Sequence, residues 1–334
     1  MSVKTEVAEL MNKDGLIYDI SEKVVYKCKL TNEEKEISEI VDAWAKEIGA
    51  TGKDYDHEIA NYITKVINPE VYDKPDELLS TMFNRGSIGE FDDEKIDVTP
   101  INTLQAYNAA KGGNVRKSYI DVTSFTPTWK HKQVETSIKY SDLRRNGFKS
   151  VATLTTFALE TLKNAQIADV FNILDSAITS SGQVFAITGS TLTKTVMDQL
   201  SLYVLDHVWN GETPFTFSLN KYAQAIANMA GYTSYMSFDM QNEFNRYGFV
   251  KEYGGMQITG ISGAKKSPDG TLLVPDLRIF GVAGVIGNMD MRGDVRVYET
   301  LDNNQEKVDI KVTGYEYGVV IDRPYKVAKV TFTA

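Results

Sequence analysis

The sequence is poor in the residues that make covalent or metal cross-links. One cysteine, Cys28, in 334 residues excludes an intramolecular disulfide and any metal site built from several cysteines. His57 precedes Glu58, as at the start of a zinc-protease helix, but Asn61 stands where the second histidine belongs. His131 has no carboxylate or cysteine at ligand spacing. The sequence therefore predicts no metal and no cofactor.

Long apolar runs are also missing. No uninterrupted stretch of about 18 apolar residues indicates a membrane span, and the first residues lack the apolar core of a signal peptide. No Asn-x-Ser/Thr sequon is present. These absences favour a soluble protein made in a reducing cytoplasm.

Positive charge is in short supply, and it is unevenly distributed. The formal net charge is −9 and the pI is about 5.1, which weighs against a dedicated nucleic-acid binder. Residues 1–100 hold 12 basic and 23 acidic residues, whereas residues 111–149 hold nine basic and three acidic ones. Either the acidic and basic segments meet, within or between chains, or both are solvated faces.

The first 95 residues are typical of short amphipathic helices. Thr31 and Glu34 form a capping-box pattern, and Gly49 is expected to end the helix that follows. A second helix is expected to end at Asn68-Pro69, and a third, short one covers residues 78–83. These helices do not make a core alone, so we expect them to lie on another surface.

In the segment that follows, apolar and polar residues alternate with the period of two that is typical of strands. Residues 95–99 and 119–125 show this alternation. The stretch between them is rich in small residues, contains glycines and is basic. This pattern predicts a long, extended hairpin or loop. A further strand is expected near residues 134–140.

Residues 149–178 carry the strongest helical signal, because they contain neither Gly nor Pro. Thirty residues would form a rod of about 45 Å, which needs a long surface to lie on. Residues 192–209, 219–230 and 238–247 are expected to be helical. Strands are expected at residues 257–261, 277–282, 295–298, 308–312, 315–321 and 327–332.

Motifs that carry chemistry are incomplete. Lys117-Ser118 follows Gly112-Gly113 but lacks the glycine that a phosphate-binding loop has before its lysine. Ser262 is not a nucleophile elbow, because the glycine spacing is absent. Arg292-Gly-Asp294 spells an integrin tripeptide, but three residues recur by chance. A chain of this size without a plausible active site is typical of an assembly subunit rather than an enzyme.

In the order of its elements, the sequence resembles the major capsid protein of tailed bacteriophages of the Hong Kong 97 type. Three segments carry the resemblance: the basic extended loop, the long helix, and the strands around residues 290–299 and 315–330. The resemblance implies an α+β, Hong Kong 97-like capsid fold. Its parts would be an N-terminal arm, an extended loop, a peripheral domain with a long spine helix, and an apical domain.

The resemblance also implies domain boundaries. The helical and acidic N-terminal arm would cover residues 1–95, and the extended loop residues 96–128. The peripheral domain would combine residues 129–180 and 291–334, with the spine helix at 149–178, and the apical domain would cover 181–290. Met1 and the length of the arm lead us to expect that the arm is not cleaved.

The function implied by the resemblance is structural. Subunits would self-assemble as homo-hexamers and homo-pentamers into an icosahedral shell around phage double-stranded DNA, which is enclosed without sequence-specific binding. The subunit would be made in the bacterial host cytoplasm and end in the virion capsid, without a membrane, where portal, scaffold or decoration proteins are further partners. Two alternatives stay open: an encapsulin-type nanocompartment shell, and an enzyme whose site has no recognisable motif.

Two groups of residues are expected to make the assembly contacts. The tip of the extended loop would dock near acidic residues of an adjacent subunit: either on its N-terminal arm, or on Glu160, Asp169 and Asp175 of its spine helix. This tip comprises Lys111, Gly112, Gly113, Arg116 and Lys117. The second group is the apolar stripe of the arm, which comprises Ile37, Ile40, Val41, Trp44 and Ile48.

Overall fold

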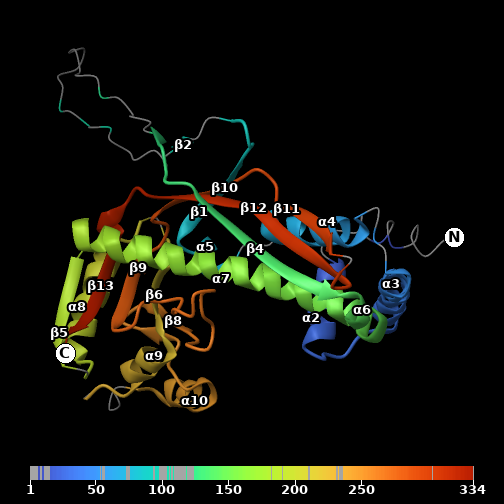
Figure 1. Ribbon diagram of the computed structural model, residues 1–334. Helices are drawn as coiled ribbons and strands as arrows, with labels where there is room; N and C mark the ends of the chain where they lie inside the picture. The colour runs from blue at the N-terminus through green and yellow to red at the C-terminus, as the bar shows by residue number, and fades with distance from the viewer. Residues whose placement is uncertain are drawn as a thin grey trace.

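The computed structural model arranges one long helix against two mixed sheets (Figure 1). It describes Val7, Leu10 and residues 16–52, 54, 57–72, 76–92, 95–97, 104, 106, 108, 118, 124–181, 183–189, 191–209, 211–230, 232, 236–302 and 304–333. The tip of the extended loop predicted from the sequence, Lys111 to Lys117, lies outside these residues.

Three helices begin the described chain: α2 (Leu16–Val25), α3 (Asn32–Thr51) and α4 (Glu58–Tyr72). The predicted capping box is present, because Thr31 accepts from the Glu34 amide while Glu34 accepts from the Thr31 amide. All three helices contribute apolar residues to a core shared with the long helix and one of the sheets. As expected, they are stabilised by another surface and not by one another alone.

Both predicted helix ends in this region are wrong. α3 continues through Gly49 and ends at Gly52, which takes the left-handed conformation. Gly49 serves close packing instead, since a Cβ there would lie 2.6 Å from the amide nitrogen of Arg144. Pro69 lies inside α4, and the helix continues to Tyr72 although proline has no amide hydrogen to bond to the preceding turn.

The third predicted helix is shorter than expected. α5 spans only Glu77–Ser80, and the chain then turns into strand β1 (Phe83–Ile88). Leu79, Met82 and Phe83 are all buried, so these apolar residues do belong to the core. The last of them, however, lie in a turn and a strand and not in a helix. Periodicity cannot separate helix from strand over so few residues.

The first sheet has five strands. β1 pairs with β10 (Gly287–Arg292), and the long strand β12 (Lys307–Ile321) pairs with β10 through its second half and with β11 (Arg296–Asp302) through its first half. β4 (Lys130–Lys139) pairs with β12 from Lys307 to Tyr317. The two strands predicted at 308–312 and 315–321 form the single strand β12. A register shift between Val312 and Tyr315 marks a bulge that contains Gly314, whose φ is +83°.

The second sheet has six strands: β5 (Gln183–Thr188), β13 (Val327–Thr333), β9 (Arg278–Ala283), β6 (Pro214–Leu219), β8 (Met256–Ile261) and β7 (Glu252–Tyr253). Helices α8 (Lys194–Asp206) and α9 (Asn220–Ala227) pack on it, and α10 (Phe238–Tyr247) lies beyond them (Figure 1). The closing strand β13 pairs with β5 and β9, so it completes the sheet of residues 183–283. The domain boundaries expected from the sequence place residues 291–334, and therefore β13, in the peripheral domain with the long helix. These boundaries stay a prediction.

The long helix α7 (Phe148–Ser181) follows the short helix α6 (Tyr140–Asn146). It covers the predicted range 149–178 and extends one residue beyond its start and three beyond its end. Its first half contributes Leu159 and Leu162 to the core below the five-stranded sheet. Its second half contributes Phe171 and Leu174 to the core of the six-stranded sheet. One helix therefore joins both halves of the molecule, as Figure 1 shows.

Candidate assembly surfaces

Polar side chains fix the middle of α7 to strand β12. The Tyr315 hydroxyl donates to Gln166 Oε1 at 2.7 Å, and the Tyr317 hydroxyl donates to Asp169 Oδ2 at 2.7 Å. The two tyrosines are two residues apart, so they point to the same face of the sheet. Burial and the adjacent Asp169 carboxylate raise the pKa of Tyr317, which keeps its hydroxyl a neutral donor.

Asp169 also holds the edge strand β4. Lys130 Nζ and Lys132 Nζ lie 3.3 Å and 2.9 Å from its carboxylate oxygens. Burial alone would raise the pKa of Asp169, but the hydrogen bonds from Lys132 and Tyr317 and the charge of Lys130 outweigh it and lower the pKa. One carboxylate thus connects α7, β4 and β12.

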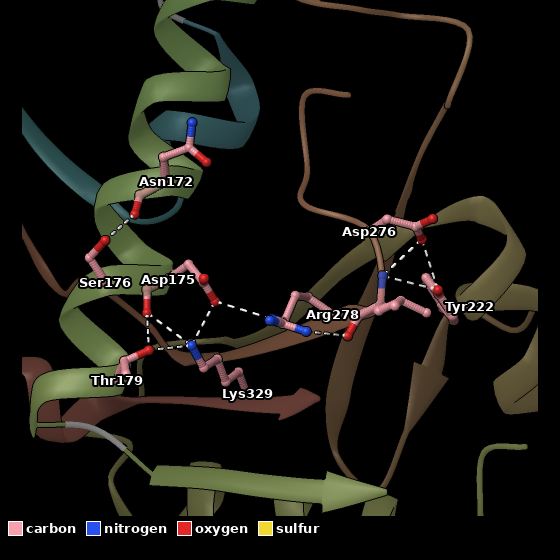
Figure 2. A network of polar contacts seen from close by, with 9 residues as sticks. Asn172, Asp175, Ser176, Thr179, Tyr222, Asp276, Arg278 and Lys329 are labelled. Carbon is pink, nitrogen blue, oxygen red and sulfur yellow. Dashed lines mark hydrogen bonds and ion pairs between the residues drawn. The ribbon is translucent and has the colours of Figure 1, made fainter. Parts of the chain in front are cut away.

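A second polar cluster fixes the end of α7 to the six-stranded sheet (Figure 2). Lys329 on β13 donates to Asp175 Oδ1 at 2.7 Å, to the Asp175 carbonyl at 3.0 Å and to Thr179 Oγ1 at 2.6 Å. Arg278 Nε on β9 lies 3.4 Å from the same Asp175 oxygen. Cations near a helix C-terminus are favoured by the helix dipole.

The base of the extended segment is held firmly on the five-stranded sheet. Strand β2 (Ile96–Asp97) pairs with β3 (Ser124–Phe125), and Ile96 is buried. Trp129 and Pro127 then pass over Gly318 of β12, where a Cβ would come within 2.7 Å of Pro127. The Arg292 guanidinium lies over the Trp129 ring at 5.7 Å. In Figure 1, β2 therefore leaves the body on the side away from the six-stranded sheet.

An open groove runs between β4 and the first half of α7. Its volume is about 600 Å³, and it is lined by residues 134–138 of β4 and by α6 and α7. Phe157 lines this groove with 48% of its surface exposed, next to half-buried Leu154. Glu135 and Asp142 line it as well. We call this feature the β4–α7 groove; it offers an aromatic contact with carboxylates beside it.

Phe157 was not among the residues expected from the sequence to make assembly contacts. It lies off the stripe that Leu154, Ala158 and Leu162 form and falls among the polar residues of the helix. A large apolar side chain on a polar helix face was the signal that could have identified it.

The three α7 carboxylates expected to receive a neighbour's loop all have partners within the chain. Asp169 and Asp175 bind the lysines described above, and Glu160 accepts from the Tyr26 hydroxyl at 2.5 Å. The loop residues expected to reach them, Lys111, Gly112, Gly113, Arg116 and Lys117, lie outside the described residues. Their docking stays a prediction.

The apolar stripe of α3 packs within its own chain. Val41, Trp44 and Ile48 are buried, while Ile37 and Ile40 are half-buried against the same core. The Trp44 indole donates to Glu58 Oε2 at 2.8 Å, and its ring centroid lies 5.3 Å from that of Tyr62. A contact of this stripe with a neighbouring subunit stays a prediction.

The histidines have ordinary partners. His131 Nε2 lies 3.0 Å from Thr313 Oγ1. The His207 ring contacts the Tyr203 ring in a tilted arrangement, and its Nδ1 lies 2.7 Å from the Tyr203 carbonyl. Among the described residues, no group of three or more His, Cys, Asp or Glu side chains could hold a metal ion. Across the same residues, none of the helices has the length and apolar character that crossing a membrane requires.

The architecture, unlike the sequence, has known counterparts. No protein-family model and no curated protein match the sequence. Among solved structures, a chain from "Capsid structure of the Cyanophage P-SCSP1u" is 11% identical with a TM-score of 0.52, and the match covers 76% of this chain and 88% of that one. The fold is that of a phage capsid chain.

Two further phage structures share this capsid fold. A chain from Gordonia phage Cozz matches with a TM-score of 0.54 at 12% identity, over 77% of this chain and 86% of that one. A chain from Microbacterium phage Oxtober96 matches with a TM-score of 0.52 at 10% identity, over 78% of this chain and 93% of that one. The α+β fold expected from the sequence is thereby confirmed.

Proposed function

We propose that this chain is a structural, non-enzymatic subunit that self-assembles into the shell of a phage. The observation that carries the proposal is the capsid fold, shared with the cyanophage chain over most of both lengths. The β4–α7 groove is the surface that we propose for a contact between subunits, because exposed Phe157 lies there inside an open groove beside half-buried Leu154 and two carboxylates. The encapsulin alternative is not favoured, since the fold is shared with phage structures.

The proposal includes the Hong Kong 97 type of organisation. Under it, the five-stranded sheet with the first half of α7 forms most of the peripheral domain, and the six-stranded sheet with helices α8, α9 and α10 forms most of the apical domain. Subunits form homo-hexamers and homo-pentamers that enclose double-stranded DNA without sequence-specific contacts. A chain of net charge −9 fits a wall that confines DNA rather than binding it tightly.

In this proposal the extended segment reaches a neighbouring subunit. Its base is fixed on β12, so the direction in which it leaves the body is set within each subunit. The segment carries Lys111, Arg116 and Lys117, whereas the β4–α7 groove carries two carboxylates, Glu135 and Asp142, against a single lysine, Lys149. This charge complementarity makes the neighbour's groove the docking site that we favour over its α7 carboxylates, which have partners already.

Negative-stain imaging with light scattering tests the function. We expect the purified protein to form rings or closed particles of several hundred kilodaltons or more. Closed particles isolated from cells infected by the source phage should contain this chain and nuclease-resistant DNA. A stable 37 kDa monomer over a wide concentration range, without particles in assembly buffer, would contradict the proposal.

Charge reversal tests the docking of the loop. Changing Lys111, Arg116 and Lys117 together to Glu replaces attraction by repulsion at every copy of the interface, so assembly should fail while the subunit stays folded. The matched control reverses three exposed lysines elsewhere, Lys29, Lys265 and Lys266, and should assemble normally. Normal particles from the loop variant, with unchanged salt dependence, would refute electrostatic docking.

A further inference from the structure

Two buried carboxyl groups from distant parts of the sequence meet at the start of α4. The Glu299 side chain on β11 has no solvent exposure, and Asp54 is 2% exposed. Asp54 accepts from the amides of Glu58 and Ile59, and Glu299 accepts from the next amide, that of Ala60, so the two carboxyl groups lie against consecutive amides of one helix turn. Two ionised carboxylates this close and this buried would repel strongly, so one shared proton stabilises the pair.

The hydrogen bonds around the pair assign the proton. Asp54 accepts from the Glu58 amide at 2.8 Å through Oδ1 and from the Ile59 amide at 3.0 Å through Oδ2. Both Asp54 oxygens therefore act as acceptors at the helix N-terminus, as in a helix cap. Glu299 Oε2 accepts from the Ala60 amide at 3.3 Å, whereas its buried Oε1 has no hydrogen-bond donor among the described residues. A proton on Oε1 would explain that missing donor.

The other end of α4 is attached to Val295, the residue just before the same strand, in a way that does not depend on pH. The Asn68 side-chain amide donates to the Val295 carbonyl at 3.2 Å, and its oxygen accepts from the Val295 amide at 3.0 Å. α4 thus contacts the β11 region at two points. One is an amide pair, and the other depends on a proton.

We propose that the Asp54–Glu299 pair is a pH-sensitive latch that holds the N-terminal end of α4 on strand β11. With the shared proton present, the helix start is closed on the strand. Loss of the proton places two negative charges in one buried site and releases this end, while Asn68 retains the other. Trp44 would sense the release, because its indole donates to Glu58 in the first turn of α4.

Two further titratable groups lie beside the latch, and two more flank the residue opposite Glu299. His57 Nδ1 lies 3.9 Å from Glu299 Oε1, but more than half of the imidazole is exposed. Glu58 adds negative charge on α4, where it accepts from Trp44. On the neighbouring strand, Ile310 stands opposite Glu299, and charged Asp309 and Lys311 flank it. A positive charge on His57 would favour the ionised form of Glu299 and so oppose the latch. The negative charge of Glu58 disfavours that form and so supports the latch.

The direction of the pH effect follows from Glu299. Burial, and then the charge of Asp54, raise the pKa of Glu299 from 4.5 to about 8. An opened latch exposes this carboxyl and returns it toward its ordinary value, so the closed state binds more protons than the open one between these two values. Closure is therefore strongest below pH 4.5, weakens as pH rises, and changes no further above about pH 8.

Hydrogen exchange at the amides of Glu58, Ile59 and Ala60 measures the latch directly, because these amides donate to the pair. We expect their protection factors, corrected for intrinsic exchange, to fall by up to about tenfold per pH unit between pH 5 and pH 8. Amides in the middle of α8 serve as the internal reference and should stay constant. Wild-type protection that does not change from pH 5 to pH 9 would overturn the proposal.

Glu299→Gln keeps the shape of the side chain and can donate to Asp54 at every pH. We expect this variant to keep its protection above pH 8, where the wild type has lost it. Glu306→Gln, which changes a glutamate that is 73% exposed at the end of the same hairpin, should behave like the wild type. A Glu299→Gln variant that loses protection with pH just as the wild type does would also overturn the latch.

His57→Asn separates the remaining titratable group, and asparagine tolerates the φ of +52° at this position. We expect the wild-type fall in protection to persist in this variant. If the fall disappears, His57 and not the carboxyl pair is the sensor, and the proposal is wrong.

Discussion

The ammonium group of Lys329 lies 2.7 Å from the Asp175 carboxylate, and the lysine side chain is only 5% exposed (Figure 2). The two residues are 154 positions apart, on the last strand and the long helix. Because β13 also completes the six-stranded sheet, this pair ties the end of the chain to the spine of the molecule. It forms part of the connection that α7 makes between the two sheets.

Removing the lysine should therefore destabilise the fold. Lys329→Ala leaves Asp175 with Arg278 alone and deprives two further acceptors of their donor, so we expect a loss of about 2–3 kcal/mol in the free energy of unfolding. The matched control is Lys221→Ala, whose pair with Asp276 is as short, at 2.6 Å, but exposed. It should cost about 1 kcal/mol or less in urea unfolding. Equal losses in both variants would contradict the role of burial.

Trp44 should be one of the costliest positions in the N-terminal helices. It is 2% exposed, so Trp44→Ala is expected to lower the free energy of unfolding by about 3–5 kcal/mol through the cavity it leaves. Trp209 is 39% exposed, and Trp209→Ala should cost clearly less. Chemical denaturation of both variants checks this, and a similar cost at the two sites would count against a packed N-terminal core.

Asp169 should contribute to stability in acid. Its pKa is lowered in the folded protein, so the unfolded state takes up the proton first as pH falls, and the contribution is present above about pH 4 and lost below it. Asp169→Asn should be less stable than the wild type at pH 6. The difference between them should shrink as pH falls toward 2.5, as followed by thermal unfolding. A difference that does not depend on pH would refute this account.

Phe157 should matter for assembly and little for folding. It is 48% exposed in the β4–α7 groove, so Phe157→Ser should change the free energy of unfolding by about 1 kcal/mol or less. Light scattering should show that particles form only at several-fold higher concentration. Phe91→Ser removes a phenylalanine that is 94% exposed outside the groove and serves as the control. Unimpaired assembly of the Phe157 variant would exclude the groove as a contact.

Local sequence signals predicted some elements well. The long helix was expected because thirty residues without Gly or Pro carry a continuous apolar stripe, and the capping box placed the start of α3 correctly. Signals carried by one residue were less reliable. Gly49 looked like a helix stop because glycine often ends helices, but here it allows α3 to pack closely against the backbone of α6.

The candidate site was only partly accessible from the sequence. Basic residues around Gly112-Gly113 and the stripe around Trp44 have local patterns, whereas a groove exists only once β4 lies beside α7. The Asp54–Glu299 pair left no signal, because each residue taken alone is an ordinary surface acid in a chain that has 45 of them.

The sequence by itself determined the local properties of this protein: its acidic balance, its lack of cross-linking residues, the long helix and the alternation of the C-terminal strands. Only the tertiary structure decided which strands became neighbours. β1 pairs with β10 across two hundred residues, and β13 joins β5 instead of the adjacent β12. The reason is physical: helix caps and periodicity act over a few residues, whereas strand pairing and buried charge depend on which surfaces meet when the core closes.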